Sequence, residues 1–393
     1  LHQTIADYAC VHLEDQRAYE NLIDYYITYV EMKKEDFRAI VNENMNIITA
    51  LDIAYELKMH EKHVKLFNVF ANSALRMKET AIYEKYGNRA YEASQSIEDV
   101  NGIMQVLFHL ALLQDKRGEY EKAEETLQRA LKLVQQSKDH PMLGLTHAIG
   151  SRLALSRCNY TLAEEYANTA LKSGLQGQNK LVIYLAYTAL GWAAGNQGRY
   201  QKMEDYAQEL LKRARQDNSH EFLCFGFLFL GQKKISEKNY VKAQEYAQES
   251  FDCANAVHYD EFASQALELL SQSERLQGKY QQAYEHAEQG LELAYKSNVL
   301  RMIGTMHISR GDALLAQNKI EEAAKAFWNA QEIIPEQVVR LCAMALYGLA
   351  RVEAEKGNLH LARQYGAESL KRLTDIGHYE RENVGQFIEA LSS

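Results

Sequence analysis

Proline is nearly absent from this chain, with 2 residues in 393. Because proline interrupts the backbone hydrogen bonds of a helix, its scarcity lets helices run without breaks. No apolar run approaches the ~18 residues of a membrane span, and no basic-then-apolar signal segment is present. The GxxxxGK[ST] phosphate-binding motif is also missing. These absences argue against a membrane protein and against nucleotide hydrolysis by these residues, and they favour an almost wholly helical fold.

Cysteine and positive charge are also sparse. The five cysteines form no CxxC pair, and they are Cys10, Cys158, Cys224, Cys253 and Cys342. We therefore expect buried, reduced thiols in a cytoplasmic protein. The formal net charge of -9 argues against a nucleic-acid partner, because phosphate binding needs a concentrated basic footprint. An acidic chain suits protein, peptide or small-molecule partners in solution.

What the chain does contain is one signal repeated every 40 residues or so. A tyrosine followed three residues later by Ala or Met marks five copies, and Ile320 and Leu359 continue the frame; the tyrosines are Tyr120, Tyr160, Tyr200, Tyr240 and Tyr280. Each copy reads as an apolar-periodic helix, a short turn and a second amphipathic helix. The sequence therefore predicts a row of helix hairpins, which is a repeat architecture.

Two further positions recur in the frame. A small residue stands seven positions before each turn, where we expect it to let the two helices of a hairpin approach closely; these residues are Ala111, Ser151, Gly191, Gly231, Ser271, Gly311 and Ala350. The turn itself holds Gly118, Cys158, Gly198, Lys238, Gly278, Asn318 and Gly357. Gly and Asn accept the left-handed conformation that ends a helix. Cys and Lys are predicted to strain or reshape the turn.

This pattern resembles the tetratricopeptide repeat over roughly residues 60 to 373, although its period of 40 exceeds the usual ~34. The resemblance implies an all-α, right-handed superhelical solenoid of about eight hairpins, with the first helices lining the concave wall. We expect a helical junction at residues 1–57, the repeat array at 58–373 and a capping helix at 374–393, with Phe387, Ile388 and Leu391 facing inward.

The first 57 residues lie outside the repeat frame and resemble a segment of another protein family. Leu1, His2, Ile5, Asp7, Tyr8 and Ala9, and the string Glu-x-x-Asn-Ile-x-x-Ala-Leu at 43–51, are similar to the junction between the winged-helix end of an NB-ARC module and a tetratricopeptide sensor in STAND ATPases. This resemblance implies a sensor that autoinhibits or activates a nucleotide-binding module upstream in the same polypeptide. The start at Leu1 fits a piece of a longer protein. The alternative is a stand-alone adaptor, scaffold or peptide-sensing regulator.

Residue types associated with catalysis do not gather into a site. His60 and His63 are three residues apart on a helix, but zinc generally takes three or four protein ligands. Paired carboxylates such as Glu124 and Glu125 stand on the solvated side of second helices rather than in a desolvated cleft. We therefore expect no catalytic residues, no metal and no cofactor in this chain.

The concave wall is the remaining candidate site. Repeat geometry directs a set of amide, arginine and aromatic side chains into it: Asn68, Asn72, Arg76, Phe108, Arg152, Thr188, Trp192, Asn196, Gln232, Gln272, Arg275, Tyr347 and Arg351. The acidic residues Asp115, Glu268 and Asp312 share these positions. Trp192 is interpreted either as a binding anchor or as packing against the neighbouring repeat. We expect a protein, a peptide or a small-molecule inducer to bind here.

Overall fold

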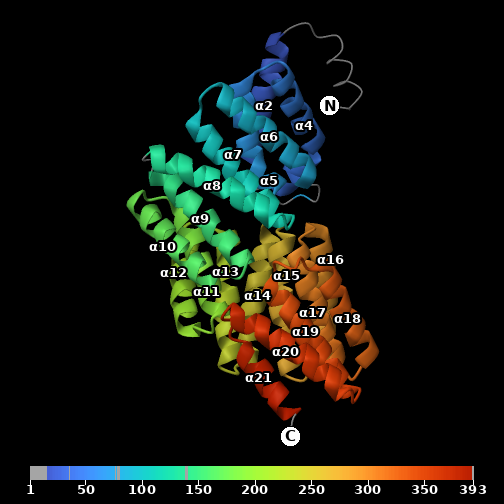
Figure 1. The fold of residues 1–393 in the computed structure, drawn as a ribbon. Coiled ribbons are helices and arrows are strands. Elements are labelled where there is room, and N and C mark those ends of the chain that lie inside the picture. The colour runs from blue at the N-terminus through green and yellow to red at the C-terminus, as the bar shows by residue number, and fades with distance from the viewer. Residues whose placement is uncertain (1–15, 35, 76, 78–79, 138–139, 392–393) are drawn as a thin grey trace. The chain divides into compact units, whose positions relative to one another are not determined.

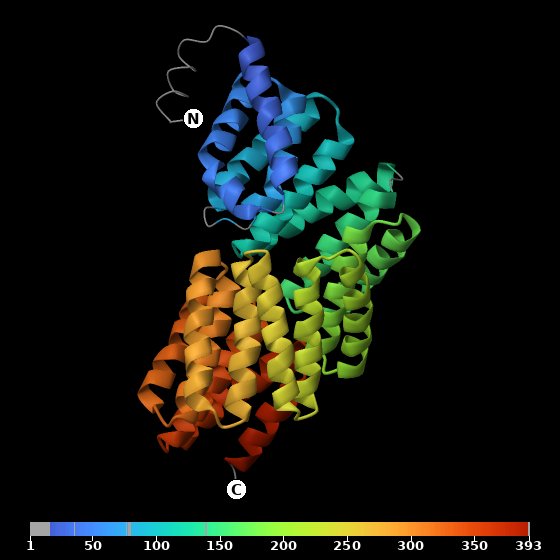
Figure 2. The same ribbon diagram turned by 180° about the vertical axis from the view of Figure 1, so that it is seen from behind.

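The computed structural model describes residues 16–34, 36–75, 77, 80–137 and 140–391. Within these residues there are 20 α-helices and no strands (Figures 1 and 2). The helices are α2 (Gln16–Lys33), α3 (Phe37–Asn42), α4 (Asn44–Glu56), α5 (His60–Ala74), α6 (Thr80–Ser96), α7 (Val100–Lys116), α8 (Tyr120–Ser137), α9 (His140–Ser156), α10 (Tyr160–Gln176), α11 (Lys180–Asn196), α12 (Tyr200–Gln216), α13 (His220–Ser236), α14 (Tyr240–Ala256), α15 (Asp260–Leu276), α16 (Tyr280–Ser297), α17 (Leu300–Ala316), α18 (Ile320–Ile333), α19 (Val339–Glu355), α20 (Leu359–Asp375) and α21 (Arg381–Ala390).

Consecutive helices from α5 to α20 form eight pairs, which confirms the predicted all-α solenoid of helix hairpins. Each second helix from α8 onward begins at the residue that marks the repeat in the sequence, as Tyr160 and Ile320 illustrate. Asn159 and Asn239 precede two of these helices, and their side chains accept hydrogen bonds of 3.2 Å from the backbone N–H groups of Leu162 and Lys242. Such caps satisfy donors that the first helical turn leaves free.

The turns within the hairpins share one backbone conformation. Gly118 and Gly198 have φ values of 76° and 72°, and Cys158 and Lys238 reach 59° at the same position. The left-handed conformation costs a residue with a Cβ roughly 1–2 kcal/mol. Cys158 and Lys238 therefore carry strain, but the turns keep the conformation of the glycine turns and are not reshaped.

The recurring small residues act differently from the prediction at two places. A Cβ built on Gly191 would lie 2.3 Å from the ring of Phe229, and one on Gly231 would lie 2.5 Å from Leu269. Phe229 and Leu269 belong to the first helix of the following hairpin. These glycines therefore make room for the next repeat, whereas Gly311, close to Phe327, does serve its own hairpin.

The first compact unit of the structure extends to Leu113. Its core includes the fully buried side chains of Ile23, Ile40, Ile47 and Leu51. Residues 43–51 contribute Ile47 and Leu51 to this core. At the start of the same segment, Glu43 accepts hydrogen bonds from Tyr26 at 3.0 Å and from Asn46 at 2.8 Å. The other residues that resemble the STAND junction, between Leu1 and Ala9, lie outside the described residues.

The second unit runs from Gln114 onward, so the contacts divide the chain within α7. Its last helix, α21, packs on the final hairpin through Val384, which is buried with Ala343 and Leu373. The Phe387 ring lies edge-on to Tyr347, with 5.4 Å between the ring centres. None of the described helices is long and apolar enough to cross a membrane.

Candidate functional site

The first helices of the hairpins form a continuous layer in the second unit. Helices α9, α11, α13, α15 and α17 each contact the next first helix of the series, which ends at α19. Side chains on the free side of this layer point toward the axis around which the hairpins turn. We call this side the inner face.

Most of the sequence-predicted residues lie on first helices. Asn68 and Asn72 are on α5 and Phe108 is on α7, all in the first unit, and Arg76 lies outside the described residues. The members in the second unit are Arg152, Thr188, Trp192, Asn196, Gln232, Gln272, Arg275, Tyr347 and Arg351. Phe108 and Thr188 are buried, with 8% and 9% of their surface exposed, and the others in the second unit are half-buried.

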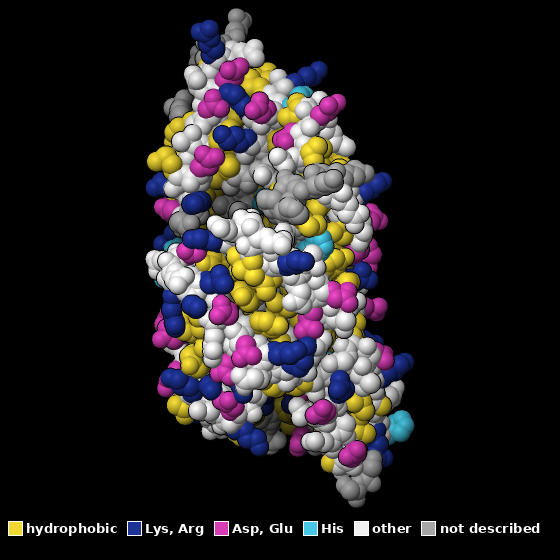
Figure 3. Space-filling view, turned by 90° about the vertical axis from the view of Figure 1, so that its left-hand side faces the viewer, with side chains coloured by type: hydrophobic (Ala, Val, Ile, Leu, Met, Phe, Trp, Pro, Cys, Tyr) yellow, Lys and Arg dark blue, Asp and Glu magenta, His cyan; other side chains and the backbone are white. Residues whose placement is uncertain are grey.

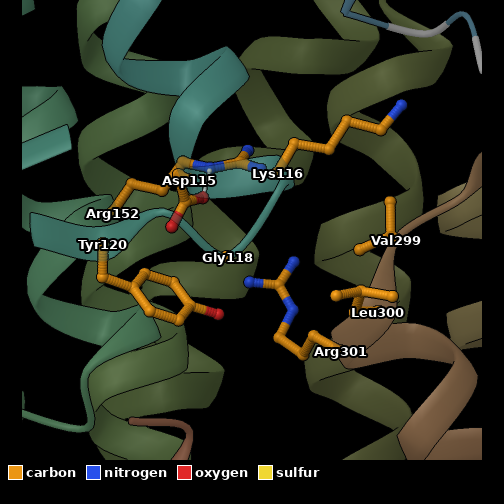
Figure 4. A pocket seen from close by; sticks show the side chains of 8 residues that line it. All are labelled: Asp115, Lys116, Gly118, Tyr120, Arg152, Val299, Leu300 and Arg301. Atoms are coloured by element: carbon orange, nitrogen blue, oxygen red, sulfur yellow. Dashed lines mark hydrogen bonds and ion pairs between the residues drawn. The ribbon is translucent and has the colours of Figure 1, made fainter. Parts of the chain in front are cut away.

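One charged cluster gathers where α7 ends. Asp115 is 5% exposed and accepts a hydrogen bond of 3.1 Å from Arg152 through Oδ2, while its buried Oδ1 has no hydrogen-bond partner. Arg301 pairs with Glu261 at 2.9 Å. Figure 4 shows Arg301 and the hydroxyl of Tyr120 directed toward each other beside the turn at Gly118. The cavity between these groups measures about 10 Å³, enough for one water molecule.

A second charged cluster lies on α15, α17 and α19. Asp312 pairs with Arg351 and lies 3.7 Å from Arg275. Burial alone would raise the pKa of Asp312, but Arg351 and Arg275 hold it below its usual value. The guanidinium of Arg351 also lies over the ring of Tyr347, at 4.7 Å from its centre. The inner-face charges are therefore paired with one another across neighbouring repeats.

Glu268 is the exception in this second cluster. Burial raises its pKa to about 6, Arg340 and Arg275 oppose the rise, and Asp312 adds to it. Ionising Glu268 therefore costs free energy in the folded protein. This loss of stability is complete above a pH of about 6 and disappears below the unfolded pKa near 4.5.

Glu268→Gln is accordingly expected to raise the free energy of unfolding at pH 8 by on the order of 2 kcal/mol. At pH 4 the substitution should have little effect, because the wild-type carboxyl is then already neutral. Urea unfolding at both pH values measures the difference, with Glu245→Gln on an exposed helix face as the control. An equal gain at both pH values would contradict the role of the buried charge.

Trp192 lies on α11, the second of the six first helices in this layer. Its ring meets Phe229 of α13 edge-on, with 5.2 Å between ring centres, and it remains half-buried. Asn196, one turn later, donates a hydrogen bond of 2.7 Å to the Trp192 carbonyl. The Trp192 side chain therefore packs on the next repeat and also keeps part of its ring accessible. Packing and a role as a binding anchor do not exclude each other.

Comparison with known families decides the nature of the repeats. A tetratricopeptide-repeat model matches residues 106–141, and another matches residues 308–375. The chain contains tetratricopeptide repeats. No curated protein sequence matches it.

Solved structures extend the comparison of the tetratricopeptide-repeat array. A Rap protein complexed with Competence and Sporulation Factor has a TM-score of 0.65 at 12% identity, covering 94% of this chain and 99% of that chain. The Rap conjugation gene regulator of plasmid pLS20, in complex with the Phr* peptide, has a TM-score of 0.57 at 15% identity, with 95% and 98% covered. A STAND protein with a tetratricopeptide-repeat sensor from Pyrococcus horikoshii has a TM-score of 0.56 at 16% identity. It covers 97% of this chain, which spans 56% of that protein. These similarities establish a shared fold.

Sequence reasoning missed part of the inner face of the tetratricopeptide-repeat array. It did not select Arg301, Glu261 or Arg340, because they lie in the first turns of first helices and away from the small-residue position. A signal was present in the spacing: Arg152 pairs with Asp115 and Arg301 with Glu261, at separations of 37 and 40 residues. Opposite charges one period apart are neighbours in a stacked array.

Metal-binding residue types do not cluster in the described part of the chain, where no group of three or more His, Cys, Asp or Glu side chains could hold an ion. His63 is fully buried, and its Nδ1 lies 2.9 Å from the Leu51 carbonyl oxygen. Burial lowers the pKa of His63 to about 4. Its surroundings are those of a core histidine.

On the face drawn in Figure 3, basic and acidic side chains are interspersed.

Proposed function

We propose that the inner face of residues 114–393 binds an extended peptide, or an extended segment of a protein. We further propose that this binding regulates the activity of a protein attached to or associated with the array. The observation that carries the proposal is the mixture of side chains on the first helices. Asn196, Gln232 and Gln272 can each both donate and accept hydrogen bonds, as a peptide backbone requires. Arg152 and Arg351 add donors for carboxylates, and Trp192 adds an aromatic anchor. No catalytic role is assigned to this chain.

Two features of the solved relatives support the proposal. One Rap structure is complexed with Competence and Sporulation Factor and the other with the Phr* peptide, and each aligns along nearly the whole of this chain and of its own. A tetratricopeptide-repeat array is also a scaffold whose extended inner surface suits an extended ligand. Regulation follows if the ligand prefers one conformation of the array, since its differential affinity supplies the free energy of the change.

Trp192→Ala tests the proposal. A random peptide library is selected on the full chain, and the best binder is labelled for fluorescence anisotropy. Loss of a central aromatic anchor is expected to weaken binding at least tenfold, or about 1.4 kcal/mol. The matched control is Trp328→Ala, on the second helix α18 and 47% exposed, which should leave the affinity unchanged. Equal affinities for both variants, or binders that protect only second helices from hydrogen exchange, would contradict the proposed site.

A second candidate function is the sensor of a STAND signalling ATPase. The similar STAND protein covers 97% of this chain, including the N-terminal helices that precede the regular repeats. In that setting an inducer on the inner face would release or restrain an upstream nucleotide-binding module. The genomic sequence immediately upstream of Leu1 tests this candidate. A phosphate-loop motif in frame supports it, and a start codon next to Leu1 contradicts it.

A further inference from the structure

Two loops near the C-terminus contact the turns of three earlier hairpins. They are residues 334–338, between α18 and α19, and residues 376–380, between α20 and α21; together we call them the clasp. A Cβ on Gly118 would lie 3.2 Å from the ring of Pro335, and one on Gly198 would lie 3.0 Å from Tyr379. Figure 1 shows the red C-terminal helices next to the green helices that bear the later of these turns.

The repeated tyrosines provide an internal comparison for these contacts. Tyr120 and Tyr160 are 4% and 3% exposed, whereas Tyr280, at the same position of a later repeat, is 40% exposed. Tyr120 belongs to the buried cluster that contains Ile334 and Val338. Tyr160 is buried in a cluster against which Ile376 packs. The clasp therefore accounts for the burial of Tyr120 and Tyr160, whereas Tyr200, whose ring Tyr379 contacts edge-on, and Tyr240 are half-buried.

Tyr379 makes the most specific contact of the clasp. Its backbone N–H donates a hydrogen bond of 3.1 Å to the carbonyl of Asn196, and its ring meets Tyr200 edge-on at 5.7 Å. The neighbouring His378 is 2% exposed and lies against Tyr160, with 6.3 Å between ring centres. Burial, helped by Arg340 and Arg381, lowers the pKa of His378 to about 2. The His378 ring is therefore neutral, and the contact combines apolar packing with the backbone hydrogen bond and a side-chain hydrogen bond between Tyr379 and Tyr200.

The clasp is joined directly to the inner face. Asn196, which accepts the hydrogen bond from Tyr379, lies one helical turn from Trp192 and donates to its carbonyl. Arg340, two residues after the first clasp loop, acts electrostatically on both Glu268 and His378. Most charges of the two inner-face clusters are already paired, and the cavity beside Arg152 has space for about one water molecule. In this conformation the cavity at the Arg152 cluster has little room for a peptide side chain.

We propose that the clasp holds residues 114–393 in a closed state, and that a partner reaches the inner face only when the clasp opens. The inference rests on the proposed function for the identity of the partner, but the closure itself concerns this chain alone. A partner that requires the open state has its apparent affinity reduced by the fraction of molecules that are open. The clasp thereby sets the concentration at which the array responds.

A disulfide between positions 198 and 379 tests the closure. Gly198→Cys with Tyr379→Cys places two Cβ atoms about 3.0 Å apart, near the ~3.5–4.5 Å of a disulfide, so a small shift suffices. Cys158 shows that cysteine is tolerated at this turn position, since it has φ 59° there. Four of the five natural cysteines, Cys158, Cys224, Cys253 and Cys342, are buried, which limits their competing reactions, and Cys10→Ser removes the fifth thiol. Peptide mass spectrometry verifies the bond.

The readout is acrylamide quenching of Trp192 in a Trp328→Phe background, which needs no partner. The reduced variant lacks the Tyr379 ring and favours the open state, and oxidation locks the clasp. We expect the quenching constant to fall at least twofold on oxidation, with unchanged helical circular dichroism. Gly198→Cys alone is the control and should not respond to oxidant.

Two outcomes would overturn the closure: failure of the disulfide to form, and formation of the disulfide with no change in quenching. The library-selected peptide is then added to both forms. Binding to the reduced form and its loss on oxidation supports both proposals. If oxidation changes the quenching but no peptide binds either form, the clasp stands and the proposed peptide-binding function fails.

Discussion

Replacing Phe327 by alanine is expected to lower the free energy of unfolding by about 3–5 kcal/mol. The ring is fully buried on α18 and lies between two glycines of neighbouring first helices. A Cβ on Gly311 would lie 2.7 Å from it, and one on Gly348 would lie 2.3 Å from it. Removing the ring therefore leaves a cavity that spans two repeats, which the backbone of stacked helices cannot easily close. Urea unfolding followed by circular dichroism measures the loss.

The adjacent Trp328 provides the control for this prediction. It is 47% exposed and touches Tyr365 edge-on, so Trp328→Ala should cost no more than about 1 kcal/mol. Gly348→Ala gives a sharper test. It should destabilise the wild-type protein, where the new methyl meets the ring, yet be neutral or stabilising in the Phe327→Ala background, where the space is empty and alanine favours the helix. The same effect in both backgrounds would show that the ring does not fill this space.

Local features of the sequence were enough to predict the hairpins. Helix-forming stretches, the turn position and the repeat-marking tyrosine all lie within one period, so each copy reports its own hairpin independently. Tyr120 and Tyr280 therefore look alike in the sequence, and both begin second helices. The 40-residue frame also predicts the positions of Trp192 and Arg351 on first helices.

Contacts between distant repeats could not be predicted in the same way. The burial of Tyr120 and Tyr160 depends on loops about 215 residues further along the chain, and nothing in either tyrosine's own repeat encodes them. The space beside Gly191 is filled by the ring of Phe229 from the next repeat. The pattern of a single hairpin does not contain this contact. A repeat frame thus specifies its units, whereas contacts between distant repeats depend on a few particular side chains, such as Pro335 and Tyr379.

Asp312→Ala is the substitution expected to disturb the inner face most. Asp312 is the shared partner of Arg351 and Arg275, and 17% of its side chain is exposed. Its removal leaves two guanidinium groups without their carboxylate in a poorly hydrated site, at a cost of about 3 kcal/mol. Arg351 also lies 5.7 Å from the centre of the Phe327 ring, so the lost pairing reaches the core of the same repeats.

The pH dependence identifies the charge as the cause. Because Arg351 and Arg275 depress the pKa of Asp312, its contribution is complete above the unfolded pKa of 3.8 and is lost as the pH falls through the folded value. The difference in unfolding free energy between wild type and Asp312→Ala should therefore be largest near pH 7 and should narrow once the pH falls below 3.8. Glu245→Ala, in an exposed pair with Lys242, should cost under about 1 kcal/mol at every pH. A difference for Asp312→Ala that is constant with pH would assign the loss to packing instead of charge.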